Sequence, residues 1–189
     1  RASFLVSFWS VLISCLQEEG HQVTCLVPAG DSEAEAIRRY YDYMIRYENL
    51  FFDPELQDVT MTHTGWDNYE YQCTSHKVSS YGEAGKIWMI LREKDYRKCI
   101  YLLNLCGQSE DYWNEGKEEP NIQKDIKFTV QVDTPVEKIC FSTPDGKNMD
   151  AVELLFTERA TRTGKFIDFT VPSLNYWTTI WIDTRKETI

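Results

Sequence analysis

The stretch IKFTVQV, residues 126–132, alternates apolar and polar side chains without a break. Such alternation predicts a β-strand that buries one face and exposes the other to water. The stretch IDFTV, residues 167–171, has the same pattern, and Val152, Leu154 and Phe156 would form a further apolar face. These segments predict antiparallel strands that pack against a common core.

Two other segments, residues 87–91 and 99–105, are apolar at nearly every position. Short runs of this kind are typical of central strands that are covered on both faces. Turn-forming residues separate the strands at 82–85, 93–97, 144–146 and 162–164. Short strands at this spacing, with no helices between them, predict a mainly β fold, an antiparallel Greek-key β-sandwich.

A helix is predicted before the strands. Ser32 and Glu35 have the spacing of a capping box, and the dipeptide at 53–54 ends the helix because a residue before proline avoids the α region. Its apolar face recurs every three or four residues. The residues of that face are Ile37, Tyr40, Met44, Tyr47 and Phe51.

The change from a helical to an alternating period predicts a boundary near residues 55–60. We expect residues 58–189 to form the β-sandwich domain. Residues 1–57 offer only one apolar segment and one helix, which cannot bury their own faces. This first part therefore resembles the end of an α/β unit more than an independent domain.

Charge and cysteine content narrow the function classes. The formal net charge of −10 repels phosphate backbones and anionic lipids, so we expect neither nucleic acid nor a membrane surface as partner. The six cysteines include no C-x-x-C pair, and we expect most of them to be reduced. The apolar run at residues 4–16 is shorter than the roughly 20 residues that cross a bilayer, and it lacks the flanks of a signal peptide.

A zinc site is a weak alternative. Its ligands would be His63, Cys73 and His76, with Cys25 or His21 as the fourth. Their spacing matches no established ligand pattern, and polar residues at exposed strand ends account for them equally well. We therefore expect no metal and no other cofactor.

Two acidic pairs stand beside aromatic residues, as the carboxyls of sugar-cleaving sites do. Asp67 and Glu70 form one pair, and Glu110 and Asp111 form the other. Acidic residues in loops are usually solvated surface. We therefore assign no catalytic residue to either pair.

The aromatic neighbours of these acids suggest a different role. Aromatics make up 14% of the chain, and exposed rings provide flat surfaces on which sugars stack. The carbohydrate-binding candidates are Trp66, Tyr112 and Trp113, with Trp177 as a further platform candidate. The alternative is that these rings belong to the core.

Several segments, in order, resemble the C-terminal part of glycoside hydrolase family 66, which comprises bacterial dextranases and cycloisomaltooligosaccharide glucanotransferases. The segment RYYDYMIRYENL, residues 39–50, resembles the last helix of that family's (β/α)8 barrel. The segments that resemble its closing Greek-key domain are GKIW at 85–88, YLLNL at 101–105, DYWN at 111–114, TPD at 143–145 and FTVPSLNYW at 169–177. The resemblance covers about residues 33–182, and residues 1–31 are atypical of the family.

The resemblance implies that the catalytic carboxylates lie upstream of this helix, and no residue here matches them. We therefore expect this chain alone to be inactive, as the accessory sandwich of an enzyme that acts on α-1,6-glucan. The resemblance implies that the catalytic barrel of the parent enzyme is its partner. It is also compatible with α-glucan as a ligand. The resemblance implies an extracellular or cell-surface location in bacteria, although we expect no signal peptide in residues 1–31.

Two other functions stay open. A stand-alone carbohydrate-binding module would need an exposed row of aromatic side chains. A purely structural accessory domain predicts that its large rings are buried, namely Trp66, Trp88, Trp113 and Trp177.

Overall fold

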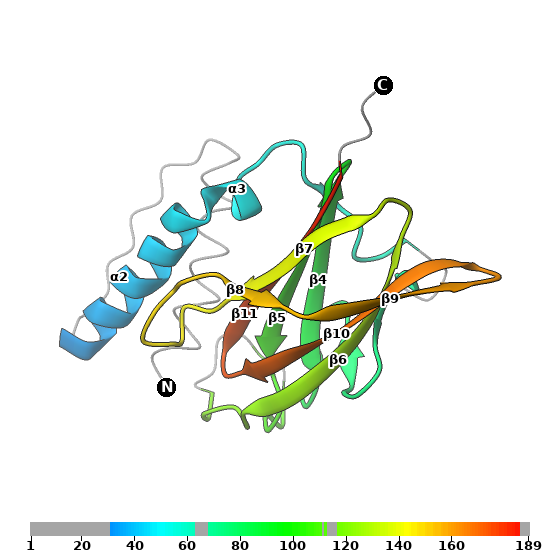
Figure 1. Cartoon of the computed structure of the whole chain (residues 1–189). Helices are drawn as coiled ribbons and strands as arrows, with labels where there is room; N and C mark the ends of the chain where they lie inside the picture. The colour runs from blue at the N-terminus through cyan, green and yellow to red at the C-terminus, as the bar shows by residue number, and fades with distance from the viewer. Residues whose placement is uncertain (1–30, 63–67, 111, 113–116, 186–189) are drawn as a thin grey trace.

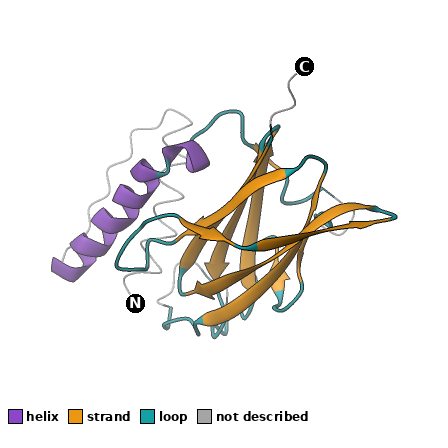
Figure 2. Cartoon of the chain, in the orientation of Figure 1, coloured by secondary structure: helices purple, strands orange, loops and turns teal. Residues whose placement is uncertain are grey.

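Two β-sheets stack face to face, and a helix lies against the outer face of one of them (Figure 1). This computed structural model describes residues 31–62, 68–110, 112 and 117–185. Strands dominate the described part, as Figure 2 shows by colour. The predicted mainly β sandwich preceded by a helix is therefore confirmed.

The first sheet has seven strands and contains the strands predicted to be central. The order is β1-β4-β5-β11-β7-β8, and the short β3 also pairs with β4. The β3–β4 pair is parallel, whereas the other described pairs are antiparallel. The bounds are β1 Gln57–Asp58, β3 Val78–Ser79, β4 Ile87–Lys94, β5 Arg97–Asn104, β7 Val136–Ser142, β8 Val152–Leu154 and β11 Trp177–Thr184.

The second sheet has four strands in the order β2-β6-β10-β9. Its strands are β2 Tyr71–Cys73, β6 Gln123–Val132, β9 Phe156–Thr161 and β10 Gly164–Leu174. The chain passes repeatedly between the sheets, so strands that are distant in sequence become neighbours. For example, β10 pairs with β6, and β11 lies between β5 and β7.

The core lies between the two sheets and matches the predicted alternation in β6. Ile126, Phe128, Val130 and Val132 are all buried. Each fully buried apolar side chain of this size stabilises the fold by about 1.5–3 kcal/mol. The ring of Phe128 stacks on Phe169 of β10 with centroids 5.5 Å apart, which fixes the register of the two strands.

The predicted common face of Val152, Leu154 and Phe156 is wrong. The first two residues belong to β8 in the first sheet, whereas Phe156 begins β9 in the second. The chain crosses between the sheets at Leu155, whose side chain is 95% exposed, and Val152 is 51% exposed. Alternation predicts which way side chains point along one strand, but it does not reveal where a strand changes sheets.

The predicted helix forms in two pieces, α2 Asp31–Arg46 and α3 Glu48–Phe51. The chain leaves helical geometry at Tyr47, with φ −114° and ψ 33°, which the apolar period did not predict. The expected end before Pro54 is confirmed. The side chain of Ser32, the predicted cap, lies outside the described residues. Neither described helix has the length and apolar content needed to cross a membrane.

Candidate functional site

An aromatic seam joins α2 and α3 to the outer face of the first sheet. Trp177 at the start of β11 is only 3% exposed and is the centre of this seam. Its ring centroid lies 5.2 Å from Tyr43 and 5.3 Å from Phe51, both in edge-on contacts. The seam consists of Tyr40, Tyr43, Tyr47, Phe51, Tyr101, Trp177 and Trp181.

The tyrosine hydroxyls of the seam also find acceptors. Tyr43 donates to the carbonyl of Ser142 at 3.1 Å, and Tyr47 donates to the carbonyl of Met149 at 2.5 Å. Burial raises the pKa of Tyr43 well above its ordinary value, so its hydroxyl stays protonated and remains a donor. Hydrogen bonds to these acceptors offset the cost of taking the hydroxyls out of water, so the tyrosine hydroxyls of the seam are satisfied.

Asp145 ties three segments together at one end of the seam. Its Oδ1 accepts from the hydroxyl of Tyr40 at 2.5 Å, and its Oδ2 accepts from the backbone N–H groups of Tyr176 and Trp177 at 2.9 and 2.8 Å. Its own N–H donates to Oγ1 of Thr143 at 3.1 Å, which shapes the turn that presents the carboxylate. One side chain thus connects α2, the β7–β8 loop and the turn before β11.

At the other end of the seam, Arg92 of β4 holds the end of α3. Its Nη1 donates to the carbonyl of Phe51 at 2.7 Å, and its Nη2 donates to the carbonyl of Leu56 at 2.8 Å. The carbonyls at the end of a helix lack partners within the helix, and a cation there is favourable. The helices are therefore fixed to the first sheet from Tyr40 to Phe51.

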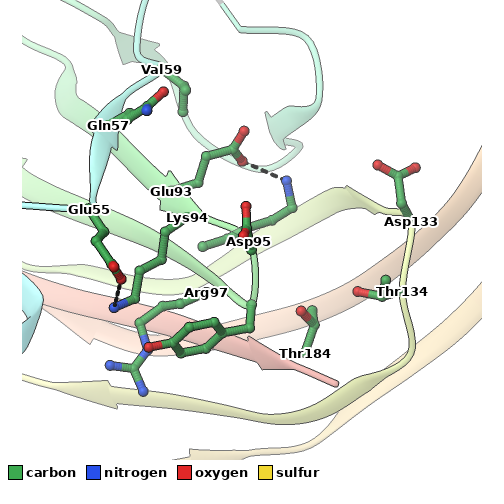
Figure 3. A pocket seen from close by; sticks show the side chains of 12 residues that line it. Glu55, Gln57, Val59, Glu93, Lys94, Asp95, Arg97, Asp133, Thr134 and Thr184 are labelled. Atoms are coloured by element: carbon green, nitrogen blue, oxygen red, sulfur yellow. Dashed lines mark hydrogen bonds and ion pairs between the residues drawn. The ribbon is translucent and has the colours of Figure 1, made fainter. Parts of the chain in front are cut away.

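A polar hollow of about 550 Å³ lies beside the β4–β5 turn (Figure 3). Segments from four parts of the chain form its wall: the β1 segment, the β4–β5 turn, the β6–β7 turn and the end of β11. Its lining residues are Glu55, Gln57, Val59, Glu93, Lys94, Asp95, Tyr96, Arg97, Lys98, Asp133, Thr134 and Thr184.

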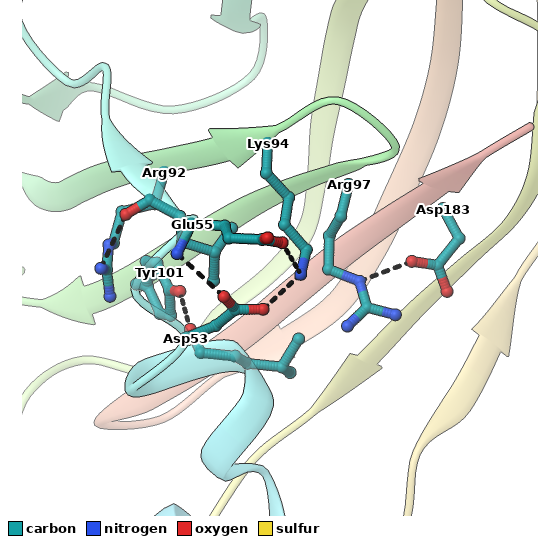
Figure 4. Close-up of polar contacts among 9 residues, drawn as sticks. Asp53, Glu55, Arg92, Lys94, Arg97, Tyr101 and Asp183 are labelled. Atoms are coloured by element: carbon teal, nitrogen blue, oxygen red, sulfur yellow. Dashed lines mark hydrogen bonds and ion pairs between the residues drawn. The ribbon is translucent and has the colours of Figure 1, made fainter. Parts of the chain in front are cut away.

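The cations of this hollow are held in ion pairs (Figure 4). Lys94 lies between Asp53 and Glu55, and its side chain is only 8% exposed. The Nε of Arg97 lies 2.6 Å from a carboxylate oxygen of Asp183. The Lys94 ammonium holds the pKa of Asp53 below its usual range, and Asp53 and Tyr96 in turn raise the pKa of Lys94. The charged groups of the hollow are therefore fixed in place and largely compensated.

Glu93 and Lys98 form the third pair, at the back of the hollow. Lys98 Nζ lies 2.6 Å from Glu93 Oε2, which also accepts from the hydroxyl of Tyr71 at 2.7 Å. Burial of the Glu93 carboxylate favours its protonated form, but the two hydrogen bonds outweigh burial. The pKa of Glu93 therefore lies below its ordinary value of 4.5.

This arrangement predicts acid sensitivity. A carboxyl whose pKa is lowered by folding contributes stability above its unfolded pKa, and the contribution is lost as pH falls through the folded pKa. We expect the free energy of unfolding to decrease as pH falls below about 4.5.

Glu93→Gln should lower the free energy of unfolding at neutral pH by about 1 kcal/mol. It should also make the decrease of stability at acid pH less steep. Urea unfolding between pH 3 and 7 measures both effects, with the exposed Glu153→Gln as a matched control. An unchanged slope in Glu93→Gln would contradict the assignment.

The predicted carbohydrate contacts are only partly described. Tyr112 lies between β5 and β6 and is 60% exposed. Trp66 and Trp113 lie outside the described residues, so their grouping with Tyr112 stays a prediction. The prediction of Trp177 as a sugar platform is wrong, because this ring is buried in the seam. Trp88, which a purely structural domain would bury, is half-buried.

The acidic pairs and the zinc candidates are also incompletely described. Asp67 and Asp111 lie outside the described residues, while Glu70 is exposed and Glu110 is half-buried. Of the zinc candidates, Cys73 and His76 are described, and a ring nitrogen of His76 lies 2.7 Å from the hydroxyl of Ser75. Within the described ranges, no group of three or more His, Cys, Asp or Glu side chains is placed to hold a metal ion.

Asp145 and the hollow were not predicted as functional features. The dipeptide Pro144-Asp145 indicated only a turn, and its carboxylate reaches partners 31 to 105 residues away in the chain. The hollow combines residues from distant segments with no local motif. The Thr143-Pro144-Asp145 motif, which contributed to the family resemblance, was the one local signal for Asp145.

Comparisons with known proteins agree on one family. The family model described as glycosyl hydrolase family 66 matches residues 30–181. Two cycloisomaltooligosaccharide glucanotransferases of Niallia circulans are 29% and 25% identical over 149 residues, which is 78% of this chain and 15% of each relative. A solved cycloisomaltooligosaccharide glucanotransferase of Paenibacillus sp., in complex with cycloisomaltoheptaose, superposes with a TM-score of 0.70 at 22% identity. That match covers 80% of this chain and 21% of the solved one.

Proposed function

Because this chain belongs to glycosyl hydrolase family 66, we propose that it is the C-terminal accessory β-sandwich of a dextranase-like enzyme that acts on α-1,6-glucan. In this proposal residues 1–57 end the catalytic barrel, and residues 58–189 form the sandwich. The chain itself lacks the catalytic carboxylates. The observation that carries the proposal is that the match extends over residues 30–181 but the chain spans only about 15% of the length of the curated relatives.

The acidic groups of the described residues support the absence of catalysis. Glycoside hydrolysis of the common type uses two carboxyl groups, and the one that acts as general acid needs a raised pKa. The described carboxyls with a shifted pKa have it lowered, by hydrogen bonds to a lysine, an arginine or a hydroxyl group. They are Asp53, Glu83, Glu93 and Asp168.

The aromatic seam supports a structural role. If α2 is the last helix of the barrel, then the seam, Asp145 and Arg92 attach the sandwich rigidly to that barrel. The catalytic barrel is the partner in this proposal. The burial of Trp177 favours a structural accessory domain over a stand-alone carbohydrate-binding module, whereas the exposure of Tyr112 leaves room for glucan contacts at Trp66, Tyr112 and Trp113.

Incubation with dextran tests this proposal. The purified chain should release no reducing sugar and no cyclic oligosaccharide above a buffer blank, because it holds no pair of catalytic carboxyls. An intact cycloisomaltooligosaccharide glucanotransferase under the same conditions is the positive control. Release by the chain would overturn the proposal, and Glu70→Gln and Glu110→Gln would then show whether either predicted acidic pair is responsible.

A further inference from the structure

We propose that the hollow beside the β4–β5 turn binds an α-1,6-linked glucan chain, through residues other than the predicted Trp66, Tyr112 and Trp113. The choice of glucan as the saccharide rests on the proposed function. The location of the site rests on the shape and the lining of the hollow.

The shape suits an extended ligand. The hollow of about 550 Å³ falls in the range of pockets that hold small molecules, roughly 300–1,000 Å³. A second hollow, of about 290 Å³, also has Thr134 in its wall, so both hollows border the β6–β7 turn. The second hollow further includes Pro135, Arg159 and Phe166. Two hollows on the same turn suit a chain of several sugar units better than a single compact molecule.

The lining suits a neutral polyol. Lys94, Arg97 and Lys98 are each paired with a carboxylate, so an anionic ligand would have to displace an existing partner. The overall charge of −10 further disfavours anions. Sugar hydroxyls both donate and accept hydrogen bonds, and the hollow offers ammonium donors, carboxylate acceptors and the hydroxyls of Thr134 and Thr184.

The polar groups are also held in position before any ligand arrives. The Lys94 ammonium lies 4.7 Å from the ring centroid of Tyr96, and the Thr184 N–H donates to the Tyr96 carbonyl at 3.0 Å. A fixed lining loses little conformational entropy on binding. The carboxylates of Asp95 and Asp133 border the hollow from two different turns, where they are placed to accept from sugar hydroxyls (Figure 3). Tyr96 adds an aromatic side chain to this wall, with the Lys94 ammonium over one face of its ring.

Titration of the purified chain with isomaltotriose and isomaltoheptaose tests the site, with NMR as the readout. We expect the backbone amide signals of Tyr96, Thr134 and Thr184 to shift, and the longer sugar to bind more tightly because it reaches both hollows. A uronic-acid oligosaccharide of similar length should bind more weakly than the neutral chain. Tighter binding of the anionic chain would contradict the proposed lining chemistry.

Two variants locate the binding. Tyr96→Ala should weaken the binding of isomaltoheptaose about tenfold, the effect of losing one ring contact. Thr134→Trp enlarges the wall residue that both hollows share, so it should abolish the advantage of the longer sugar. Thermal unfolding confirms that each variant is folded. Tyr81→Ala is the matched control, since it removes a tyrosine that is 59% exposed and lies outside the hollow, and its affinity should stay unchanged. Tyr112→Ala tests the predicted loop contacts instead.

The outcomes separate this inference from the proposed function. If Tyr112→Ala loses affinity for isomaltoheptaose and Tyr96→Ala keeps it, the hollow is not the binding site. Glucan binding would then be assigned to the predicted loop contacts. If the wild-type chain binds neither sugar, the assignment of the hollow as a glucan-binding site is also wrong. The proposed accessory role does not depend on this result, because the dextran-release assay tests it. Binding at the hollow together with dextran cleavage would refute the proposed function alone.

Discussion

Trp177→Ala is expected to lower the free energy of unfolding by about 4 kcal/mol, the usual cost of removing a large buried ring. Trp177 contacts Tyr40, Tyr43 and Phe51 from the sheet side, so its loss leaves a cavity between the helices and the first sheet. We also expect α2 to separate from the sheet before the sandwich unfolds. Chemical denaturation measures the first effect, and hydrogen exchange in α2 measures the second.

The control for this variant is Tyr112→Ala, which removes an aromatic side chain that is 60% exposed. Its effect should lie within about 0.5 kcal/mol, as is usual for surface positions. A loss below about 1 kcal/mol in Trp177→Ala would mean that the seam contributes little to the attachment of α2. In that case the structural role that we assign to the seam would be wrong.

Asp145→Ala is expected to destabilise the chain by about 3 kcal/mol, because three donors lose the carboxylate to which they bond. The backbone N–H groups of Tyr176 and Trp177 and the hydroxyl of Tyr40 would each lose a charged partner. Asp145→Asn keeps one carbonyl oxygen and should fall between alanine and the wild type. Urea denaturation at neutral pH provides the measurement.

Asp150→Ala is a matched control for Asp145→Ala, since it removes another aspartate that bonds to α2. Asp150 pairs with Arg46 at 2.5 Å, but both side chains are about half exposed, at 60% and 48%. Exposed ion pairs of this kind contribute roughly 0–1 kcal/mol. Equal effects of the two alanine variants would show that Asp145 is no more than another surface contact.

The sequence predicted the elements that depend on local periodicity. The alternation at residues 126–132 correctly predicted the apolar residues of β6 that enter the core, although Thr129 on the predicted wet face is also buried. The run at 99–105 correctly predicted a strand covered on both faces. The predicted apolar face of the helix did not include Tyr43, although this residue is fully buried. The prediction used only one row of residues at three- and four-residue spacing. In the structure the apolar face of α2 is wider, since the helix packs into the seam over an arc that includes both Tyr40 and Tyr43.

The candidate site could be predicted much less well. The donors to the Asp145 carboxylate lie 31 to 105 residues away in the chain. The walls of the hollow come from segments as distant as Glu55 and Thr184. Pairing at such distances leaves no periodic signal. Trp177 shows the same limit in another way. Its aromatic character suggested a sugar platform, but the ring is buried because a helix covers it. The alternation of residues within one strand does not predict which helix packs on that strand.

The position of β11 in the first sheet also determines when this domain can fold during synthesis. All eight residues of Trp177–Thr184 are buried, and this strand separates β5 from β7. It leaves the ribosome after every other described strand, so until then β5 and β7 lack their shared neighbour. Contacts between strands some 80 residues apart close slowly. The nascent sheet should therefore stay incomplete until residue 184 has left the ribosome, and a ribosome stalled just before Trp177 should carry a chain that proteases readily digest.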